Sequence, residues 1–154
     1  MSRMVITCDL GKISLLFRPD AAAITCSHIA QLIGAGLFNN ISWYRSDFVI
    51  QTGLYGTSRA NPFPNLPTNE TSTGMRLSNV RGTVAIAHHD VPDNGNSEFF
   101  INLQDNVHLD KAYGGYCVFA NVEDNDEESF KVVDAVARAV KAGGKVLISK
   151  VDVV

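Results

Sequence analysis

The clearest hydrophobic pattern in the chain is an apolar residue at every second position near its start. Two short runs share this pattern: Met4, Ile6 and Cys8, then Ile13, Leu15 and Phe17. The residues between the runs, Asp9-Leu10-Gly11-Lys12, contain a glycine and suit a turn. Because side chains on a strand point alternately to opposite faces, this pattern predicts a β-hairpin with one buried face.

Apolar residues recur at helical spacing in two further segments, one near each end of the chain. Pro19-Asp20 opens the first segment and Asp126-Glu127-Glu128 opens the second, as the first turn of a helix prefers. Gly34 and Gly36 follow the first segment, and Gly143-Gly144 follows the second. Glycines at these places end helices, so the sequence predicts two helices that are far apart along the chain.

The remaining apolar runs predict strands. They are a strand pair around a tight bend within residues 41–51, then strands at residues 83–87, 99–103, 116–122 and 145–154. Helices do not alternate with these seven or eight strands, which argues against a parallel sheet and favours an antiparallel barrel capped by two helices. Residues 52–74 are rich in Gly, Pro, Asn, Ser and Thr, and so long a surface excursion often lines a binding site.

Composition and charge narrow the class of protein. The chain has 154 residues, 45% of them apolar and 19% charged, which suits one globular domain over residues 1–154. A net charge of −3 without a basic stripe argues against nucleic acid as the main partner. Residues 21–44 lack charged side chains but hold polar residues and glycines, so we interpret them as a core helix and a turn, not as a membrane span. Three widely spaced cysteines without a C-x-x-C pair, and no secretory signal, predict reduced thiols in an intracellular protein.

No motif of nucleophilic, phosphate or dinucleotide chemistry is present in the sequence. His88-His89 is the most conspicuous pair, but neighbours on a strand point to opposite faces and do not easily share one metal ion. We therefore predict neither a metal nor a cofactor, and the hydrophobic pattern alone predicts a β-barrel with one polar, loop-rich face.

Three groups of residues take the interpretation further, because each resembles a motif of one protein family. Trp43-Tyr44-Arg45 and Phe48-Val49-Ile50-Gln51-Thr52-Gly53 resemble F-H-R…G-F-M-I-Q-G/T-G. Arg81-Gly82-Thr83-Val84-Ala85-Ile86-Ala87 and Asn94-Gly95-Asn96-Ser97-Glu98-Phe99-Phe100-Ile101 resemble R-G-x-[LV]-[AS]-M-A…N-G-S-Q-F-F-I. His108-Leu109-Asp110 and Tyr116-Cys117-Val118-Phe119-Ala120-Asn121-Val122 resemble [WH]-L-D…V-F-G-x-V. Together these three motifs resemble those of the cyclophilin family. The resemblance implies an eight-stranded antiparallel closed barrel capped by two α-helices, and peptidyl-prolyl cis–trans isomerase activity.

The resemblance also implies which residues form the site. Arg45 matches the catalytic arginine and Gln51 the glutamine that orients it. The matched substrate-binding residues are Phe48, Val49, Phe100 and Leu109 on the walls of the proline pocket, Ala87, His88 and Glu98 in the groove beside it, and His108 and Tyr116 in the places of a tryptophan and a histidine. Since Phe99 and Phe100 are neighbours on a strand, only one can face the substrate, and we expect it to be Phe100.

Two departures from the family pattern bear on activity. Only Ser46-Asp47 separates Arg45 from Phe48, where the family usually has four residues; an even difference preserves the strand alternation, so Arg45 can still face the groove beside Gln51. Glu98 stands where the family usually has glutamine. A glutamate places a negative charge near Arg45 and lacks the amide donor of the glutamine. We therefore predict weaker or altered peptide binding.

These features lead to one main prediction of function and one alternative. The main prediction is an isomerase that assists protein folding by turning X–Pro bonds in polypeptide clients, acting as a monomer in the cytoplasm or nucleus. Because His108 lacks an indole ring, cyclosporin should bind weakly. The alternative is a non-catalytic or weakly active proline-peptide-binding module in a larger assembly such as a spliceosome. For Arg45 itself, the structural alternative to catalysis is a buried ion pair. A metal-binding barrel is a third reading.

Overall fold

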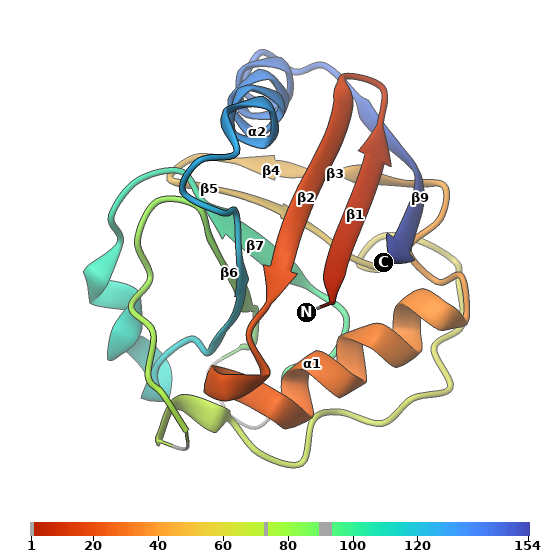
Figure 1. The fold of residues 1–154 in the computed structure, drawn as a ribbon. Helices are drawn as coiled ribbons and strands as arrows, with labels where there is room; N and C mark the ends of the chain where they lie inside the picture. The colour runs from red at the N-terminus through yellow and green to blue at the C-terminus, as the bar shows by residue number, and fades with distance from the viewer. Residues whose placement is uncertain (1, 73, 90–93) are drawn as a thin grey trace.

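The structure is a computed structural model, and it describes residues 2–72, 74–89 and 94–154. The strands are β1 (Arg3–Cys8), β2 (Gly11–Phe17), β3 (Ile41–Trp43), β4 (Arg45–Ser46), β5 (Val49–Thr52), β6 (Thr83–Ile86), β7 (Phe99–Asn102), β8 (Val118–Asn121) and β9 (Val146–Val153). The helices are α1 (Pro19–Gly34) and α2 (Glu127–Lys141), with short 3-10 turns η1 (Glu70–Ser72), η3 (Val107–Asp110) and η4 (Ala112–Gly114). Both predicted helices and the predicted opening hairpin are confirmed (Figure 1).

The strands form one antiparallel sheet in the order β3-β9-β1-β2-β8-β6-β7-β5-β4. Its two end strands, β3 and β4, are separated in the chain only by Tyr44. The sheet therefore curls into a nearly closed barrel, as the family resemblance implies.

The strand count is nine in the described residues, one more than the eight that the resemblance implies. The difference arises at Tyr44, where the chain changes its pairing partner. Ile41 and Trp43 pair with β9, whereas the backbone N–H of Tyr44 donates to Gln51 of β5 at 3.1 Å. One continuous run of the chain is thereby divided into β3 and β4.

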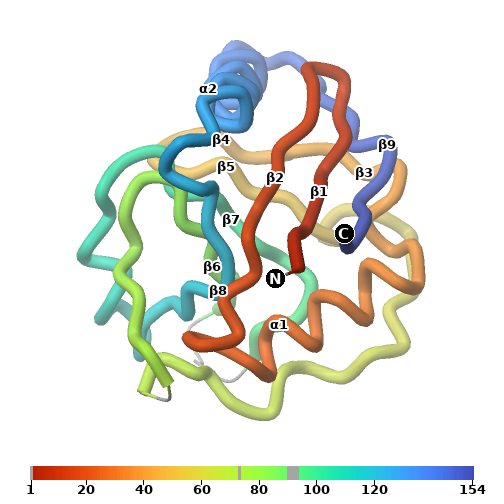
Figure 2. Tube along the Cα trace, viewed as in Figure 1, coloured from red at the N-terminus to blue at the C-terminus, as the bar shows by residue number. Residues whose placement is uncertain are grey.

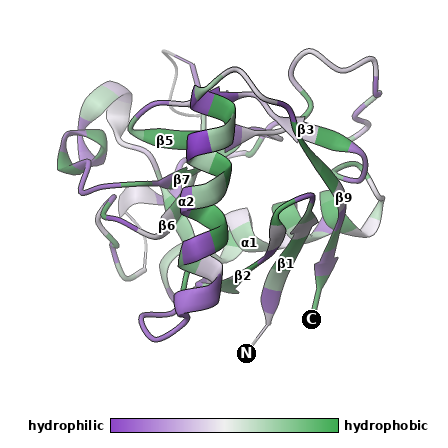
Figure 3. Ribbon diagram, turned by 90° about the horizontal axis from the view of Figure 1, so that it is seen from above, coloured by the Kyte–Doolittle hydropathy of each residue, from purple (hydrophilic) through white to green (hydrophobic). Residues whose placement is uncertain are grey.

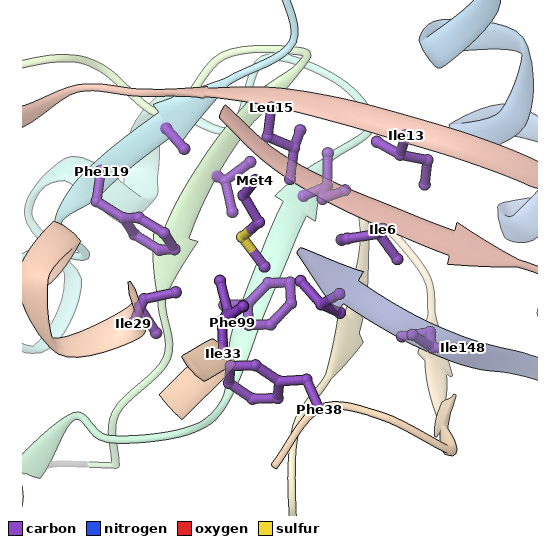
Figure 4. Close-up of a cluster of buried hydrophobic side chains, with 14 of the residues drawn as sticks. Met4, Ile6, Ile13, Leu15, Ile29, Ile33, Phe38, Phe99, Phe119 and Ile148 are labelled. Carbon is purple, nitrogen blue, oxygen red and sulfur yellow. The ribbon is translucent and has the colours of Figure 1, made fainter. Parts of the chain in front are cut away.

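The interior of the barrel is filled by the inward positions of its strands. Met4, Ile6, Ile13 and Leu15 are fully buried, as the alternation near the start of the chain predicts (Figure 4). Phe99 lies among them and makes edge-to-face contacts with Phe38, at 5.4 Å between ring centroids, and with Trp43, at 6.2 Å. The centre of the barrel is therefore a packed core and not a binding cavity.

The two helices lie at opposite ends of the barrel (Figure 1). α2 carries both hydrophilic and hydrophobic residues (Figure 3), and its Val133 and Val136 are buried in the core. At its start the Asp126 carboxylate accepts hydrogen bonds from the Ser129 backbone N–H (3.0 Å) and hydroxyl (2.6 Å). The Ser129 hydroxyl also accepts from the Ser14 backbone N–H at 2.9 Å, which ties the helix start to β2.

α1 occupies most of the uncharged run over residues 21–44, and its buried face includes Ile29, Leu32 and Ile33. The interpretation of this run as a core helix followed by a turn is therefore confirmed. Within the residues that the structure describes, no helix has both the length and the apolar character to cross a membrane.

The described part of the polar excursion over residues 52–74 passes outside α1 (Figure 2). Its Glu70 is buried, and the carboxylate accepts hydrogen bonds from the backbone N–H groups of Ile24 (3.1 Å) and Thr25 (2.6 Å). The helix is irregular at Ala22, so these two N–H groups find a partner in Glu70. Glu70 thus supports the start of the helix, and the described part of the excursion contributes only Leu54 and Tyr55 to the groove described next.

Candidate active site

An open groove of about 840 Å³ lies on the outer side of the barrel, where β5, β7, η3 and the segments after β5 and β6 meet. Every substrate-site residue that the family resemblance implies lines it. These residues are Arg45, Phe48, Val49, Gln51, Ala87, His88, Glu98, Phe100, His108, Leu109 and Tyr116.

The floor of the groove is apolar because β7 has two buried faces. Phe99 packs into the barrel core, whereas Phe100 packs into a second cluster with Val49 and Leu109. These three residues of the second cluster are no more than 9% exposed. Phe100 and not Phe99 therefore lines the groove, as strand alternation predicts.

Arg45 lies on one wall of the groove and is held by two side chains. It pairs with Gln51 across β4 and β5, and its Nη1 donates to Gln51 Oε1 at 3.1 Å. Its Nε donates to Asp47 Oδ2 at 2.8 Å, while the other Asp47 oxygen accepts from the Val49 backbone N–H at 3.2 Å. The guanidinium carbon lies 5.3 Å from the centre of the Phe48 ring.

The short turn after Arg45 therefore keeps the guanidinium beside Gln51. Arg45 does form an ion pair, but the pair is open to solvent, with 41% of the Arg45 side chain and 46% of the Asp47 side chain exposed. A purely structural role for Arg45 predicts a buried ion pair, and this pair is not buried.

Glu98 lines the groove, but its carboxylate is occupied by the protein itself. Oε1 accepts from the Tyr44 hydroxyl and the Tyr55 backbone N–H, both at 3.0 Å. Oε2 accepts from the Leu54 backbone N–H at 3.1 Å and from the Ser97 hydroxyl. Within the described part of the chain, Glu98 forms no ion pair with Arg45. The charge near Arg45 is thus compensated by four local donors.

Burial, together with the charge of Glu98, raises the pKa of the Tyr44 hydroxyl above its usual value. Tyr44 therefore keeps its proton and can donate to the carboxylate. The same hydroxyl accepts from Gln51 Nε2 at 2.9 Å, which connects Glu98 to the residue beside Arg45.

Aromatic and histidine rings also line the groove. His88 stacks on Tyr116 with 4.2 Å between ring centroids, and Tyr116 meets Phe100 edge-on at 5.7 Å. The ring centroids of His108 and Phe48 lie 5.6 Å apart, so these two groove residues contact each other edge-on.

The prediction that His88 and His89 point to opposite faces of a strand is wrong, because β6 ends at Ile86 and both histidines line the groove. Among the residues that the structure describes, no three His, Cys, Asp or Glu side chains are arranged to hold a metal ion.

Several groove residues were not identified from the sequence. They are Tyr44, Leu54, Tyr55, His89, Asn94, Asn96, Ser97, Ala112 and Tyr113. Tyr44 and Asn94 to Ser97 fall inside the motifs quoted above. Their place next to predicted site residues could therefore have identified them as groove residues. Leu54, Tyr55, Ala112 and Tyr113 lie in irregular segments whose position in space no local pattern specifies.

Comparisons with known proteins agree on one family. The family model described as "Cyclophilin type peptidyl-prolyl cis-trans isomerase/CLD" matches residues 3–154. Peptidyl-prolyl cis-trans isomerase B of Escherichia coli is 33% identical over 122 residues, covering 74% of this chain and 73% of that protein. The isomerase cyp18 of Streptomyces antibioticus is 30% identical over 151 residues, covering 93% of this chain and 87% of that protein.

A solved structure gives the same answer for the fold. The cyclophilin-type isomerase of Cryptosporidium parvum, crystallised in the presence of the dipeptide Ala-Pro, superposes with a TM-score of 0.78 at 17% identity. The match covers 97% of this chain and 96% of that one.

Proposed function

The chain belongs to the cyclophilin-type peptidyl-prolyl cis–trans isomerase family, and we propose that Arg45, oriented by Gln51, carries the isomerisation of X–Pro bonds in its groove. As a member of this family the chain is a peptidyl-prolyl cis–trans isomerase that binds proline-containing peptides. One observation carries the assignment of roles: a half-exposed guanidinium stands beside an apolar floor, fixed on two sides. The non-catalytic alternative is not favoured by the comparisons.

The reaction needs no bond to be made or broken. Rotation about the peptide bond meets a barrier of about 18–20 kcal/mol because amide resonance is lost, and uncatalysed X–Pro bonds turn over in tens to hundreds of seconds. Turnover in milliseconds requires roughly 10⁵-fold acceleration, or about 7 kcal/mol. The protein therefore has to bind the twisted amide more tightly than the planar one.

Arg45 has a donor to spare for the twisted amide. In that state the proline nitrogen becomes pyramidal and regains a lone pair that can accept a hydrogen bond. Nε and Nη1 of Arg45 are engaged with Asp47 and Gln51, and Nη2 makes no hydrogen bond within the described residues. A guanidinium stays charged at any working pH, so this donor is always available.

The arginine alone is insufficient, and the apolar floor supplies the second contribution. A charged hydrogen bond is worth about 1.5–3 kcal/mol, less than half of what is needed. We propose that Val49, Phe100 and Leu109 hold the pyrrolidine ring while Phe48 and His108 close one end of its pocket. A ring held there lets the acyl side rotate against a fixed proline, which favours the twisted geometry.

We propose further that cyclosporin binds weakly, because His108 offers a smaller apolar surface than an indole. A residual activity above 90% at about ten times the concentration that halves the activity of a cyclosporin-sensitive isomerase supports this proposal. Complete inhibition at that concentration contradicts it.

We also propose that residues 1–154 act as one isomerase domain and as a monomer, in the cytoplasm or nucleus. The single-domain and monomer proposals are supported by the one sheet that the strands form and by a groove that this chain lines by itself. The proposed compartment is supported by three buried free cysteines, which suit a reducing environment. Size-exclusion chromatography with light scattering and cell fractionation test these points.

The proposed roles are tested with a protease-coupled isomerisation assay on a tetrapeptide that contains Ala-Pro. The wild type should accelerate the cis-to-trans step, and Arg45→Ala should lower kcat/KM by roughly 100-fold, which corresponds to one charged hydrogen bond of about 3 kcal/mol. Peptide affinity measured separately by calorimetry should change less than tenfold. Equal activity in wild type and Arg45→Ala contradicts the assignment.

A further inference from the structure

Four side chains form a continuous hydrogen-bonded series along the groove, which we call the groove network: Glu98, Tyr44, Gln51 and Arg45. The Tyr44 hydroxyl donates to Glu98 Oε1 at 3.0 Å and accepts from Gln51 Nε2 at 2.9 Å. Gln51 Oε1 accepts from Arg45 Nη1 at 3.1 Å. Glu98 is thus connected to the proposed catalytic residue without touching it.

The direction of every bond in the groove network follows from the carboxylate at its end. An ionised carboxylate only accepts hydrogen bonds, so the single proton of the Tyr44 hydroxyl is directed to Glu98. The hydroxyl oxygen is then left to accept, and the group that donates to it is the amide nitrogen of Gln51. The Gln51 oxygen consequently faces Arg45, which has only donors.

We infer that Tyr44 and Glu98 are positioning residues for the isomerisation, which act through Gln51 to present an acceptor to Arg45 and hold its guanidinium against the groove. This inference rests on the proposed function of Arg45. A glutamine amide can turn by 180°, and in the turned state its NH₂ group would meet the guanidinium donor to donor. The groove network removes that state.

Glu98 is itself rigidly held, which a positioning role requires. Its remaining acceptor sites are filled by the backbone N–H groups of Leu54 and Tyr55 and by the Ser97 hydroxyl. Tyr44 is held at its ring as well, since the rings of Tyr44 and Tyr55 lie 5.8 Å apart. The raised pKa of Tyr44 is consistent with a hydroxyl that remains a donor.

The carboxylate at position 98 fixes this direction from one end of the groove network, and the guanidinium of Arg45, which has only donors, favours the same direction from the other end. An amide there offers both a donor and an acceptor, so the Tyr44 hydroxyl could donate to Gln51 and reverse the series. The family motifs quoted above carry histidine in place of Tyr44 and glutamine in place of Glu98. Tyr44 and Glu98, which both differ from those motifs, contact each other through the hydrogen bond that the Tyr44 hydroxyl donates to Glu98, and we interpret them as one functional unit.

A double-mutant cycle tests the inference. Tyr44→Phe removes the hydroxyl and keeps the ring, and it should lower kcat by roughly three- to tenfold, the equivalent of one hydrogen bond, while KM changes less than about twofold. In the Gln51→Ala background the same substitution should change kcat less than about 1.5-fold, because the group through which Tyr44 acts is absent. Glu98→Gln should follow the same pattern, and Glu128→Gln on α2, outside the groove, is the matched control.

Equal losses in both backgrounds, a rise in KM without a fall in kcat, or no loss in the wild-type background would each overturn the inference. Thermal unfolding of each variant establishes that it is folded, and Glu98→Gln replaces Tyr44→Phe in the cycle if the latter is not.

A readout without substrate separates this inference from the proposed function. In ¹⁵N NMR spectra of the free protein, Tyr44→Phe and Glu98→Gln should both shift the Gln51 side-chain NH₂ and the Arg45 Nε–H resonances, and Glu128→Gln should shift neither. An inactive wild type would refute the proposed function while these shifts still decide whether the groove network orders Arg45. Unshifted Arg45 and Gln51 resonances would refute the inference in an active enzyme as well.

Discussion

Gly53→Ala should destabilise the protein strongly, because Gly53 lies against the carboxylate of Glu98. Gly53 has φ of +149°, a conformation that residues with a Cβ rarely adopt, and a Cβ added there would overlap the Glu98 carboxylate. The carboxylate would have to leave the backbone N–H groups of Leu54 and Tyr55. The substitution thus adds backbone strain and also breaks charged hydrogen bonds.

The two contributions can be given magnitudes. Backbone strain of this kind costs about 1–3 kcal/mol. A hydrogen bond to a charged group contributes about 1.5–3 kcal/mol, part of which water restores because Glu98 is only partly buried. We expect a net loss of about 2–4 kcal/mol in the free energy of unfolding, or a fall of about 5–15 °C in Tm for a chain of this length.

Two other glycines provide matched controls. Gly56 also has a positive φ, of +79°, but an added Cβ there meets nothing within 4 Å, so Gly56→Ala should cost only the strain of about 1 kcal/mol. Gly34 is in α1 with open space around it, and Gly34→Ala should be neutral or stabilising by up to about 1 kcal/mol. Urea unfolding followed by tryptophan fluorescence measures all three. If Gly53→Ala is no less stable than Gly56→Ala, the close approach of Gly53 to Glu98 does not contribute to the free energy of unfolding.

Three further predictions concern stability and thiol chemistry. Asp126→Ala should lower the free energy of unfolding by about 1–2 kcal/mol because α2 loses its N-cap, and a loss below 0.5 kcal/mol in urea unfolding would contradict this. Burial raises the pKa of Cys26 to about 12 and that of Cys117 to about 11, so the native protein at pH 8 should react with a thiol reagent far more slowly than the unfolded protein, which should titrate all three cysteines. Because these folded-state pKa values lie above the unfolded ones, the stabilisation is complete below about pH 9 and is lost as the pH rises from there toward 12. Unfolding free energies that are flat across that range would argue against this linkage.

The parts of the fold that could be predicted are those in which a short pattern decides the outcome. The alternation in residues 4–17 specifies a buried face, and the hairpin follows from it. The start of α2 was predictable because Asp126 and the acidic residues after it meet the exposed N–H groups of a first turn. The place of Phe100 in the groove followed from the two-residue period of a strand.

The parts that could not be predicted depend on contacts between distant segments. Tyr44 divides a strand because its two sides pair with different neighbours, and no local pattern marks such a change. The same holds for the surroundings of Glu98, since two of its donors are backbone N–H groups that any residue except proline would supply. From the sequence Glu98 is an acidic residue near Arg45, and only the fold reveals that its charge is already compensated.

The most direct test of the central claim is NMR exchange spectroscopy on an Ala-Pro peptide mixed with a catalytic amount of this protein. It measures the cis–trans exchange rate at equilibrium and needs no coupling protease. The account predicts exchange cross-peaks with the wild type and their loss with Arg45→Ala at equal peptide occupancy. Cross-peaks of equal intensity with both proteins would contradict the claim that the Arg45 guanidinium, set against an apolar groove, carries the reaction.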